Sequence, residues 1–219
     1  MHRYPIVLNI QGVKCLVVGG GKVGTRKAQT LLDGGARVVV VSLQFSDRLQ
    51  QMAEDTNLLL VKRAYRSEDL QNTFLVIGAT NDSRVNQRIG IDAYKSGVLC
   101  NIADRPESSH FIVPSIIRRG DLTLTISTGG KSPAMAKRIR QRLENQFGNE
   151  YSEFFELMGR IRQVLLAQEH APQRHKQLFD ALIDAGLLEM LRDKRIDAVD
   201  ELLQSVLGSE YTFTRLMTT

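Results

Sequence analysis

The first hundred residues alternate short apolar runs with longer segments in which apolar residues recur at helical spacing. The apolar runs predict five strands over Val13–Val18, Arg37–Val41, Leu58–Lys62, Phe74–Ala79 and Val98–Ile102. The segments between them predict helices over Lys22–Asp33, Asp47–Glu54 and Asn81–Lys95. Apolar strands that alternate with helices are typical of a parallel sheet covered on both faces. The pattern therefore predicts a doubly wound α/β domain.

The pattern changes after residue 104, where three short strands are expected over His110–Val113, Ile116–Arg118 and Leu122–Ser127. The remainder predicts helices over Pro133–Gln146, Glu150–Gln168, Pro172–Ala185 and Asp197–Leu207. We thus expect a Rossmann-like α/β parallel-sheet domain over residues 1–112. A small β dimerisation region with a helix follows over 113–146, and a C-terminal helical domain over 147–219.

Composition excludes several classes of protein. The longest apolar runs are four residues in a chain of 219, far short of the roughly 20 residues that cross a membrane. The first residues also lack the apolar stretch of a secretory signal. The two cysteines, Cys15 and Cys100, lie within predicted strands and are expected to be core residues rather than a disulfide. We therefore expect a cytoplasmic protein.

Positive charge is concentrated in one stretch of the chain. Between residues 118 and 142 there are seven Lys or Arg residues and one Asp, a surplus of six, whereas the whole chain carries +5. Such a field favours an anionic partner, and nucleic acid, a nucleotide and a polycarboxylate all qualify. The alternative is a solvated helix face with no ligand.

A glycine motif follows the first predicted strand and opens the first helix. It reads Gly19-x-Gly21-x-x-Gly24 with Lys22 and Val23 between, which is the context that a dinucleotide fingerprint needs. The first glycine allows a tight turn, the second lets the backbone approach a pyrophosphate, and the third lets the helix pack on the strand. We expect these five residues to bind the cofactor, the alternative being a turn without a ligand.

The ends of two further strands supply other candidate cofactor contacts. Ser42 stands where NAD-binding folds usually place an Asp or Glu, and no arginine accompanies it, so this strand leaves the choice between NAD and NADP open. Thr80 and Asn81 follow the fourth strand, at the edge where ligands bind. Alternatively, Asn81 or Asp82 simply caps the next helix.

Asp104 closes the fifth strand and would face the same crevice. It is a candidate general base, or a group that holds a metal ion or a pyrrole N–H, the alternative being a turn residue before Arg105-Pro106.

A second glycine turn, Ser127–Lys131, precedes a helix with Ser132 as cap, and it is either an anion site or a plain connection. The four histidines show no metal-ligand spacing, so no bound metal is expected.

These residues resemble the precorrin-2 dehydrogenase family, the dehydrogenase/ferrochelatase module of siroheme synthases. The resemblance covers about residues 1–145. It rests on Pro5-Ile6, Gly19–Ala28, Ala79–Asp82 with Val85-Asn86, Cys100–Asp104, Phe111–Ser115 and Ser127–Pro133.

The resemblance implies that the chain oxidises precorrin-2 to sirohydrochlorin with NAD, as a homodimer. Many members also insert ferrous iron, and some cobalt, so Fe²⁺ is a further implied substrate. Asp104 would be the acid/base residue. Ser127, Thr128, Gly129 and Lys131 would line the active site, although fused relatives have Ser where this chain has Thr128.

The substrate carries many carboxylates, which Arg138 and its basic neighbours would receive. Because the sequence ends at Thr219, we also expect no methyltransferase domain and a supply of precorrin-2 from another enzyme.

Two other classes remain open. One is a dinucleotide-sensing regulatory module without catalytic activity, which would need neither Asp104 nor the Phe111–Ser115 string. The other is a nucleic-acid-binding protein that uses the basic stretch, but no aromatic residue is interleaved there. We expect no nucleic-acid and no membrane partner.

Overall fold

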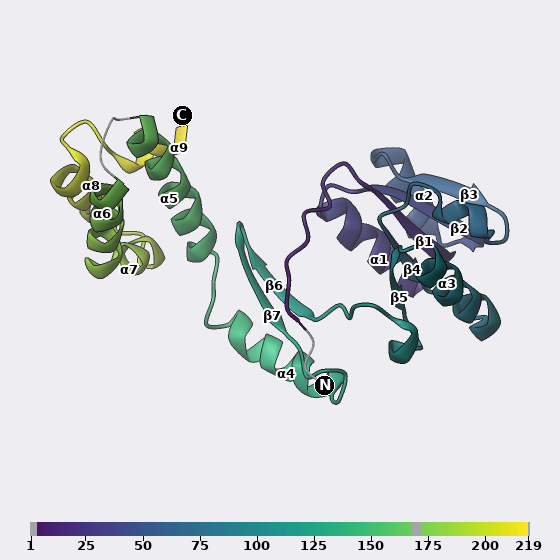
Figure 1. Cartoon of the computed structure of the whole chain (residues 1–219). Coiled ribbons are helices and arrows are strands. Elements are labelled where there is room, and N and C mark those ends of the chain that lie inside the picture. Colours follow the sequence, from purple (N-terminus) through teal and green to yellow (C-terminus); the bar gives the residue numbers. More distant parts are fainter. Residues whose placement is uncertain (1–3, 168–171, 219) are drawn as a thin grey trace. The chain divides into compact units, whose positions relative to one another are not determined.

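A computed structural model describes residues 4–167 and 172–218 of the chain (Figure 1). The chain divides into two compact units, Met1–Val113 and Pro114–Thr219. Within the described residues, no helix is both long enough and apolar enough to cross a bilayer. The expected helix end at Gln168 lies outside the described residues.

The first unit is built on a five-stranded parallel sheet. Its strands are β1 (Lys14–Gly20), β2 (Arg37–Phe45), β3 (Leu59–Lys62), β4 (Leu75–Gly78) and β5 (Leu99–Ile102). Their spatial order is β3-β2-β1-β4-β5, so the direction of winding reverses between β1 and β4. Parallel sheets of this kind bind ligands at the carboxyl ends of the strands beside that reversal.

Helices cover both faces of the sheet, as Figure 1 shows. They are α1 (Lys22–Asp33), α2 (Asp47–Asp55) and α3 (Ser83–Lys95), with single turns η1 (Ser67–Leu70) and η2 (Pro106–Ser108). Alternate residues of β1 enter different cores: Cys15 and Val17 pack with α1 and α2, whereas Leu16 and Val18 pack with α3. Burial on both faces is why the strands read as continuous apolar runs.

The second unit contains an antiparallel hairpin followed by helices. The hairpin pairs β6 (Ser115–Arg119) with β7 (Leu122–Ile126). The helices are α4 (Pro133–Glu144), α5 (Glu150–Ala167), α6 (Pro172–Asp184), α7 (Leu187–Arg192), α8 (Ile196–Leu207) and α9 (Phe213–Thr218). One apolar cluster joins α5 to the helices that follow it, with Leu157, Leu182 and Leu203 fully buried.

The structure confirms the expected Rossmann-like architecture. The prediction of one strand is wrong. His110–Val113 forms no strand, because this segment joins β5 through mixed bonds: the His110 N–H donates to the Cys100 carbonyl, and the Asn101 side-chain amide donates to the Phe111 carbonyl. The sequence pattern does not predict the short helices α7 and α9 or the turns η1 and η2. The division of the second part at residue 146 stays a prediction.

Candidate functional site

The glycine loop between β1 and α1 is shaped by two close backbone approaches. Gly19 has φ +118°, and a Cβ there would collide with the carbonyl of Ala79 at the end of β4. A Cβ on Gly24 would collide with the carbonyl of Gly19. Both glycines therefore bring the start of α1 close to the ends of β1 and β4, where the winding reverses.

Gly21 is different, because nothing in the protein lies within 4 Å of a Cβ built on it. Its φ of −81° also suits any residue, so neither packing nor backbone strain requires a glycine here. Gly21 is the N-cap of α1 and provides no side-chain cap, which leaves the first N–H groups of the helix for another acceptor. An open backbone at a helix N-terminus is what a pyrophosphate needs.

A cleft of about 670 Å³ opens over this loop, and we call it the glycine-loop cleft. Its walls come from the ends of β1, β2 and β4 and from the residues after β3. The expected cofactor residues that line it are Gly19, Gly21, Lys22, Ser42, Thr80 and Asn81. Val23 instead lies 41% exposed on α1, and Gly24 packs beneath the loop. The size and lining of the cleft fit a dinucleotide.

The Ser42 side chain forms hydrogen bonds with the backbone around the glycine loop. Its hydroxyl oxygen accepts the backbone N–H of Gly20 at 3.0 Å and that of Gln44 at 3.4 Å. These bonds use the oxygen as an acceptor and do not use the hydroxyl hydrogen, which can still be donated. Ser42 therefore shapes the cleft wall as well as lining it.

One buried amide joins the glycine-loop cleft to Asp104. Asn86 on α3 is 1% exposed, and its Nδ2 donates to the Thr80 carbonyl at 3.0 Å and to Asp104 Oδ1 at 2.9 Å. Its Oδ1 accepts from the Thr80 N–H at 3.2 Å and from the Thr80 hydroxyl at 2.7 Å. All four hydrogen-bonding positions of the amide are thus used.

Asp104 is exposed and is not among the residues that line the cleft. It lies one side chain away, because Asn86 contacts both Asp104 and Thr80. The cap of α3 is Asp82, whose carboxylate accepts the N–H groups of Arg84 and Val85. Asn81, which lines the cleft, is not that cap.

Two cleft residues that sequence reasoning missed follow β3. Arg63 lines the cleft, and its guanidinium is paired with Asp69. Tyr65 is 7% exposed and donates to Asp92 Oδ2 at 3.1 Å. Burial, together with the charge of Asp92, raises the pKa of the Tyr65 hydroxyl, which therefore stays protonated at neutral pH. Neither residue belongs to a local motif, and only the sheet order brings them to the cleft.

The expected substrate residues lie in the second unit: Ser127, Thr128, Gly129 and Lys131 lie between β7 and α4, and Arg138 lies on α4. The Ser127 hydroxyl accepts the N–H of Gly129 at 3.1 Å, and the Thr128 hydroxyl accepts the N–H of Ser132 at 3.0 Å. Ser132 caps α4, as expected. The Thr128 hydroxyl thus holds the turn together, while Lys131 and Arg138 are exposed.

Of the seven basic residues between residues 118 and 142, two bond to groups of the protein and five are exposed. Arg119 donates to the carbonyls of Phe147, Glu144 and Arg118, and Arg140 pairs with Glu144. The exposed cations are Arg118, Lys131, Lys137, Arg138 and Arg142. The structure shows no group of three or more His, Cys, Asp or Glu residues placed to hold a metal ion within residues 4–167 and 172–218.

Comparison with known proteins places this geometry in a family. Residues 6–115 match the model of the family described as "Putative NAD(P)-binding", and residues 119–146 match "Sirohaem biosynthesis protein central". The chain belongs to this putative NAD(P)-binding family, and its central segment matches that of sirohaem biosynthesis proteins. Membership of this NAD(P)-binding family assigns NAD(P) as the cofactor.

Relatives in this family include larger proteins. Siroheme synthase 2 of Yersinia enterocolitica is 38% identical over 184 residues, which cover 84% of this chain and 37% of that protein. Siroheme synthase of Citrobacter koseri is 33% identical over 209 residues, covering 95% and 46% respectively. The chain therefore spans less than half the length of these relatives.

A solved structure described as "SirC, precorrin-2 dehydrogenase" matches the fold with a TM-score of 0.78 at 29% identity. The match covers 93% of this chain and 98% of that one.

Proposed function

We propose that this chain oxidises precorrin-2 to sirohydrochlorin with NAD⁺. The observation that carries the proposal is the buried Asn86 amide, which joins a cleft that fits a dinucleotide to the carboxylate of Asp104. The oxidation removes two electrons and two hydrogens, one as a hydride and one as a proton. A regulatory nucleotide sensor would need the cleft but not the carboxylate.

The chain's own residues divide this work. Bound NAD⁺ supplies the hydride acceptor. The N-terminus of α1 and Gly21 would hold its pyrophosphate, and Ser42 and Thr80 would contact it along the cleft wall. Asp104 would accept the proton from the macrocycle, as a carboxylate within reach of a reacting group can. Asn86 is a positioning residue, because its bond to Asp104 Oδ1 fixes the carboxylate's orientation.

The second unit would bind the tetrapyrrole through its carboxylates. Five exposed cations lie on β6, on the turn before α4 and on α4 itself, and charge-assisted hydrogen bonds from such groups suit a polycarboxylate. In this proposal the turn Ser127–Lys131 and Arg138 contact the substrate. The backbone bonds within the turn keep it in one conformation.

The direct test is an anaerobic assay of the purified chain with precorrin-2 and NAD⁺, following NADH and sirohydrochlorin together. We expect both products in equal amounts. Asp104→Ala should lower kcat by about a hundredfold or more, in the range of a lost general base, while the Kd for NAD⁺ is unchanged. Asp55→Ala, at the exposed end of α2, is the matched control. NAD⁺ binding without any oxidation would contradict the proposal and favour the sensor.

A double-mutant cycle tests the role of Asn86. Asn86→Ala alone should lower kcat by about tenfold, the order of one lost positioning hydrogen bond. The double variant Asn86→Ala/Asp104→Ala should be no slower than Asp104→Ala, because Asn86 acts through that carboxylate. If the two losses multiply instead, Asn86 supports the fold and not the orientation of Asp104.

The proposal also includes a homodimer and iron insertion. The β6–β7 hairpin is a two-stranded sheet, and the outer edge of such a sheet is a site where a second copy can pair. Sedimentation of the purified chain should give twice the mass of one chain.

Adding Fe²⁺ after the oxidation assay should yield siroheme faster than in protein-free buffer. Equal rates would remove metal insertion from the proposal.

A further inference from the structure

Arg63 occupies the place beside the end of β2 where NAD-binding folds choose between NAD and NADP. Ser42 on β2 pairs in register with Lys62 on β3, so Arg63 directly follows the paired region. Arg63 lines the glycine-loop cleft together with Ser42, Leu43 and Gln44. In such folds the end of the second strand lies beside the adenosine ribose, and a nearby arginine accommodates the 2′-phosphate of NADP.

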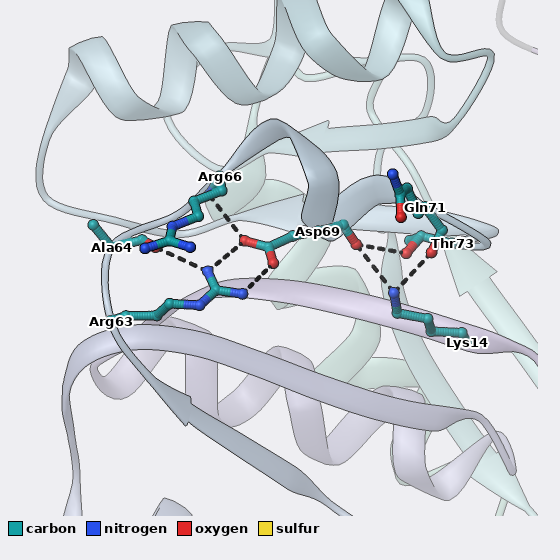
Figure 2. A network of polar contacts seen from close by, with 7 residues as sticks. All are labelled: Lys14, Arg63, Ala64, Arg66, Asp69, Gln71 and Thr73. Carbon is teal, nitrogen blue, oxygen red and sulfur yellow. Dashed lines mark hydrogen bonds and ion pairs between the residues drawn. The ribbon is translucent and has the colours of Figure 1, made fainter.

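The guanidinium of Arg63 is already engaged, as Figure 2 shows. Its Nη1 donates to Asp69 Oδ2 at 2.9 Å and its Nη2 donates to Asp69 Oδ1 at 2.5 Å, which is the bidentate arrangement. Nη1 also donates to the carbonyl of Ala64 at 3.0 Å. The Asp69 side chain is 10% exposed and that of Arg63 is 34% exposed, so water is largely kept from the carboxylate but reaches the guanidinium.

Asp69 is itself held in place by its surroundings (Figure 2). The N–H of Arg66 donates to Asp69 Oδ2 at 2.9 Å, and the carbonyl of Asp69 accepts from Lys14 Nζ at 3.1 Å and from the Thr73 hydroxyl at 3.0 Å. Lys14 also donates to the carbonyl of Gln71 at 2.8 Å. The carboxylate therefore cannot turn away from Arg63 without losing the bond from the Arg66 N–H that caps the turn η1.

The consequence is a cation that lines the cleft but has its charge neutralised. Of the described residues that line the cleft, the cationic ones are Lys22, the first residue of α1, and Arg63. A 2′-phosphate beside β2 would therefore meet a guanidinium that is already paired, with a carboxylate behind it. The two hydroxyls of an NAD ribose need no such cation and accept the Ser42 hydroxyl as a donor.

We propose that the Arg63–Asp69 ion pair makes the glycine-loop cleft select NAD⁺ over NADP⁺. This inference rests on the proposed function only in that the cleft is the cofactor site. Asp69 acts by pairing with the Arg63 guanidinium. Without the Asp69 carboxylate, Arg63 can pair with a 2′-phosphate, and the cleft then accepts NADP⁺.

The experiment measures Kd for NAD⁺ and for NADP⁺ by calorimetry, without tetrapyrrole. Wild type should bind NAD⁺ at least about tenfold more tightly than NADP⁺. Asp69→Asn keeps an acceptor for the Arg66 N–H and removes the carboxylate charge. It should strengthen NADP⁺ binding by about tenfold or more, the worth of one charged hydrogen bond, and leave NAD⁺ within about twofold. Arg63→Met added to Asp69→Asn should abolish the gain.

Asp33→Asn is the matched control, since it changes the net charge equally at the exposed C-terminal end of α1. Asp69→Ser, which also retains a cap acceptor, replaces Asp69→Asn if thermal unfolding shows that the latter is not folded. A folded variant with no gain in NADP⁺ affinity overturns the inference, as does a wild type that binds NADP⁺ as tightly as NAD⁺. A wild type that binds neither nucleotide refutes the proposed function instead.

Discussion

At the scale of single residues, Gly21 separates what folding requires from what a ligand requires. Its backbone angles, φ −81° and ψ −172°, suit a helix N-cap of any type, and a Cβ would meet no protein atom. Asp is a favourable N-cap residue, so Gly21→Asp should keep the free energy of unfolding within about 1 kcal/mol of wild type. Its carboxylate would fill the pyrophosphate position, so NAD⁺ binding should weaken by about a hundredfold or more.

Calorimetry with NAD⁺ and urea unfolding together check this prediction. Gly159→Asp is the control, because a Cβ on Gly159, in α5 of the second unit, would also meet open space and the variant gains the same charge. Retained tight binding in Gly21→Asp would show that the pyrophosphate lies elsewhere.

Residues within a local motif could be predicted from sequence, and residues that act across the sheet could not. The glycine loop was predictable because a turn between a strand and a helix is set by neighbours in the chain. Arg63 could not be, since the sheet order alone brings it beside Ser42. Asn86 did leave a signal: it shares a helix face with buried Ile89 and Ala93, and a polar residue in an apolar stripe needs partners.

At the scale of elements, the turn η1 depends on an ion pair and so on pH. Burial of the Asp69 carboxyl raises its pKa, but the hydrogen bonds from Arg63 and from the Arg66 N–H outweigh this and hold the pKa below its ordinary value of 3.8. Because the pKa of Asp69 is lower in the folded state, its charged form stabilises the fold at any pH above 3.8, the ordinary pKa. This stabilisation is lost as the pH falls through the lowered pKa of the folded state.

Urea unfolding across pH 7 to 2 should show this loss. Wild type should be more stable than Asp69→Asn at pH 7, and the difference in free energy of unfolding should shrink below about pH 4. A gap between wild type and Asp69→Asn that stays constant down to pH 2 would mean that the charge of Asp69 contributes no stability.

Long elements with clear periodicity were predicted well, and short ones were not. The bounds of α1 match the expectation, because its glycine loop and Gly34-Gly35 mark both ends. The six-residue helix α7 begins after Gly186 in the left-handed region, with φ +82°, and is too short for a pattern of helical repeats. Its stability comes from packing, since Leu187 and Leu191 are buried in the helical core.

At the scale of the whole molecule, charge and cofactor chemistry belong to different units. The exposed cations of α4 include Lys137 and Arg138, whereas the glycine-loop cleft is lined entirely by residues of the first unit. Lys137→Glu/Arg138→Glu should therefore weaken precorrin-2 binding by about tenfold or more and reduce its salt dependence, with NAD⁺ binding unchanged.

Fluorescence titration with the tetrapyrrole at several salt concentrations measures this effect. Arg162→Glu/Lys176→Glu makes the same change in net charge on exposed positions of α5 and α6, and it should have little effect. Equal losses in both double variants would assign the attraction to the overall charge of the chain.

The fold class was predictable at this scale because alternation of apolar strands with helices admits few arrangements. The extent of the helical core was less predictable than the fold class. Helices α7 and α9 join that core through side chains that are far apart in the sequence, such as Leu191 and Leu216.

The two thiols of the chain lie out of reach of reagents. Cys15 and Cys100 are each 0% exposed, and burial raises the pKa of the Cys15 thiol to about 11, so its reactive thiolate is scarce at neutral pH. A dye carrying a maleimide should therefore spare both in the native protein. Cysteines introduced on the surface of each unit would be the sites of labelling, and energy transfer between two dyes could follow the units during turnover without removal of any native residue.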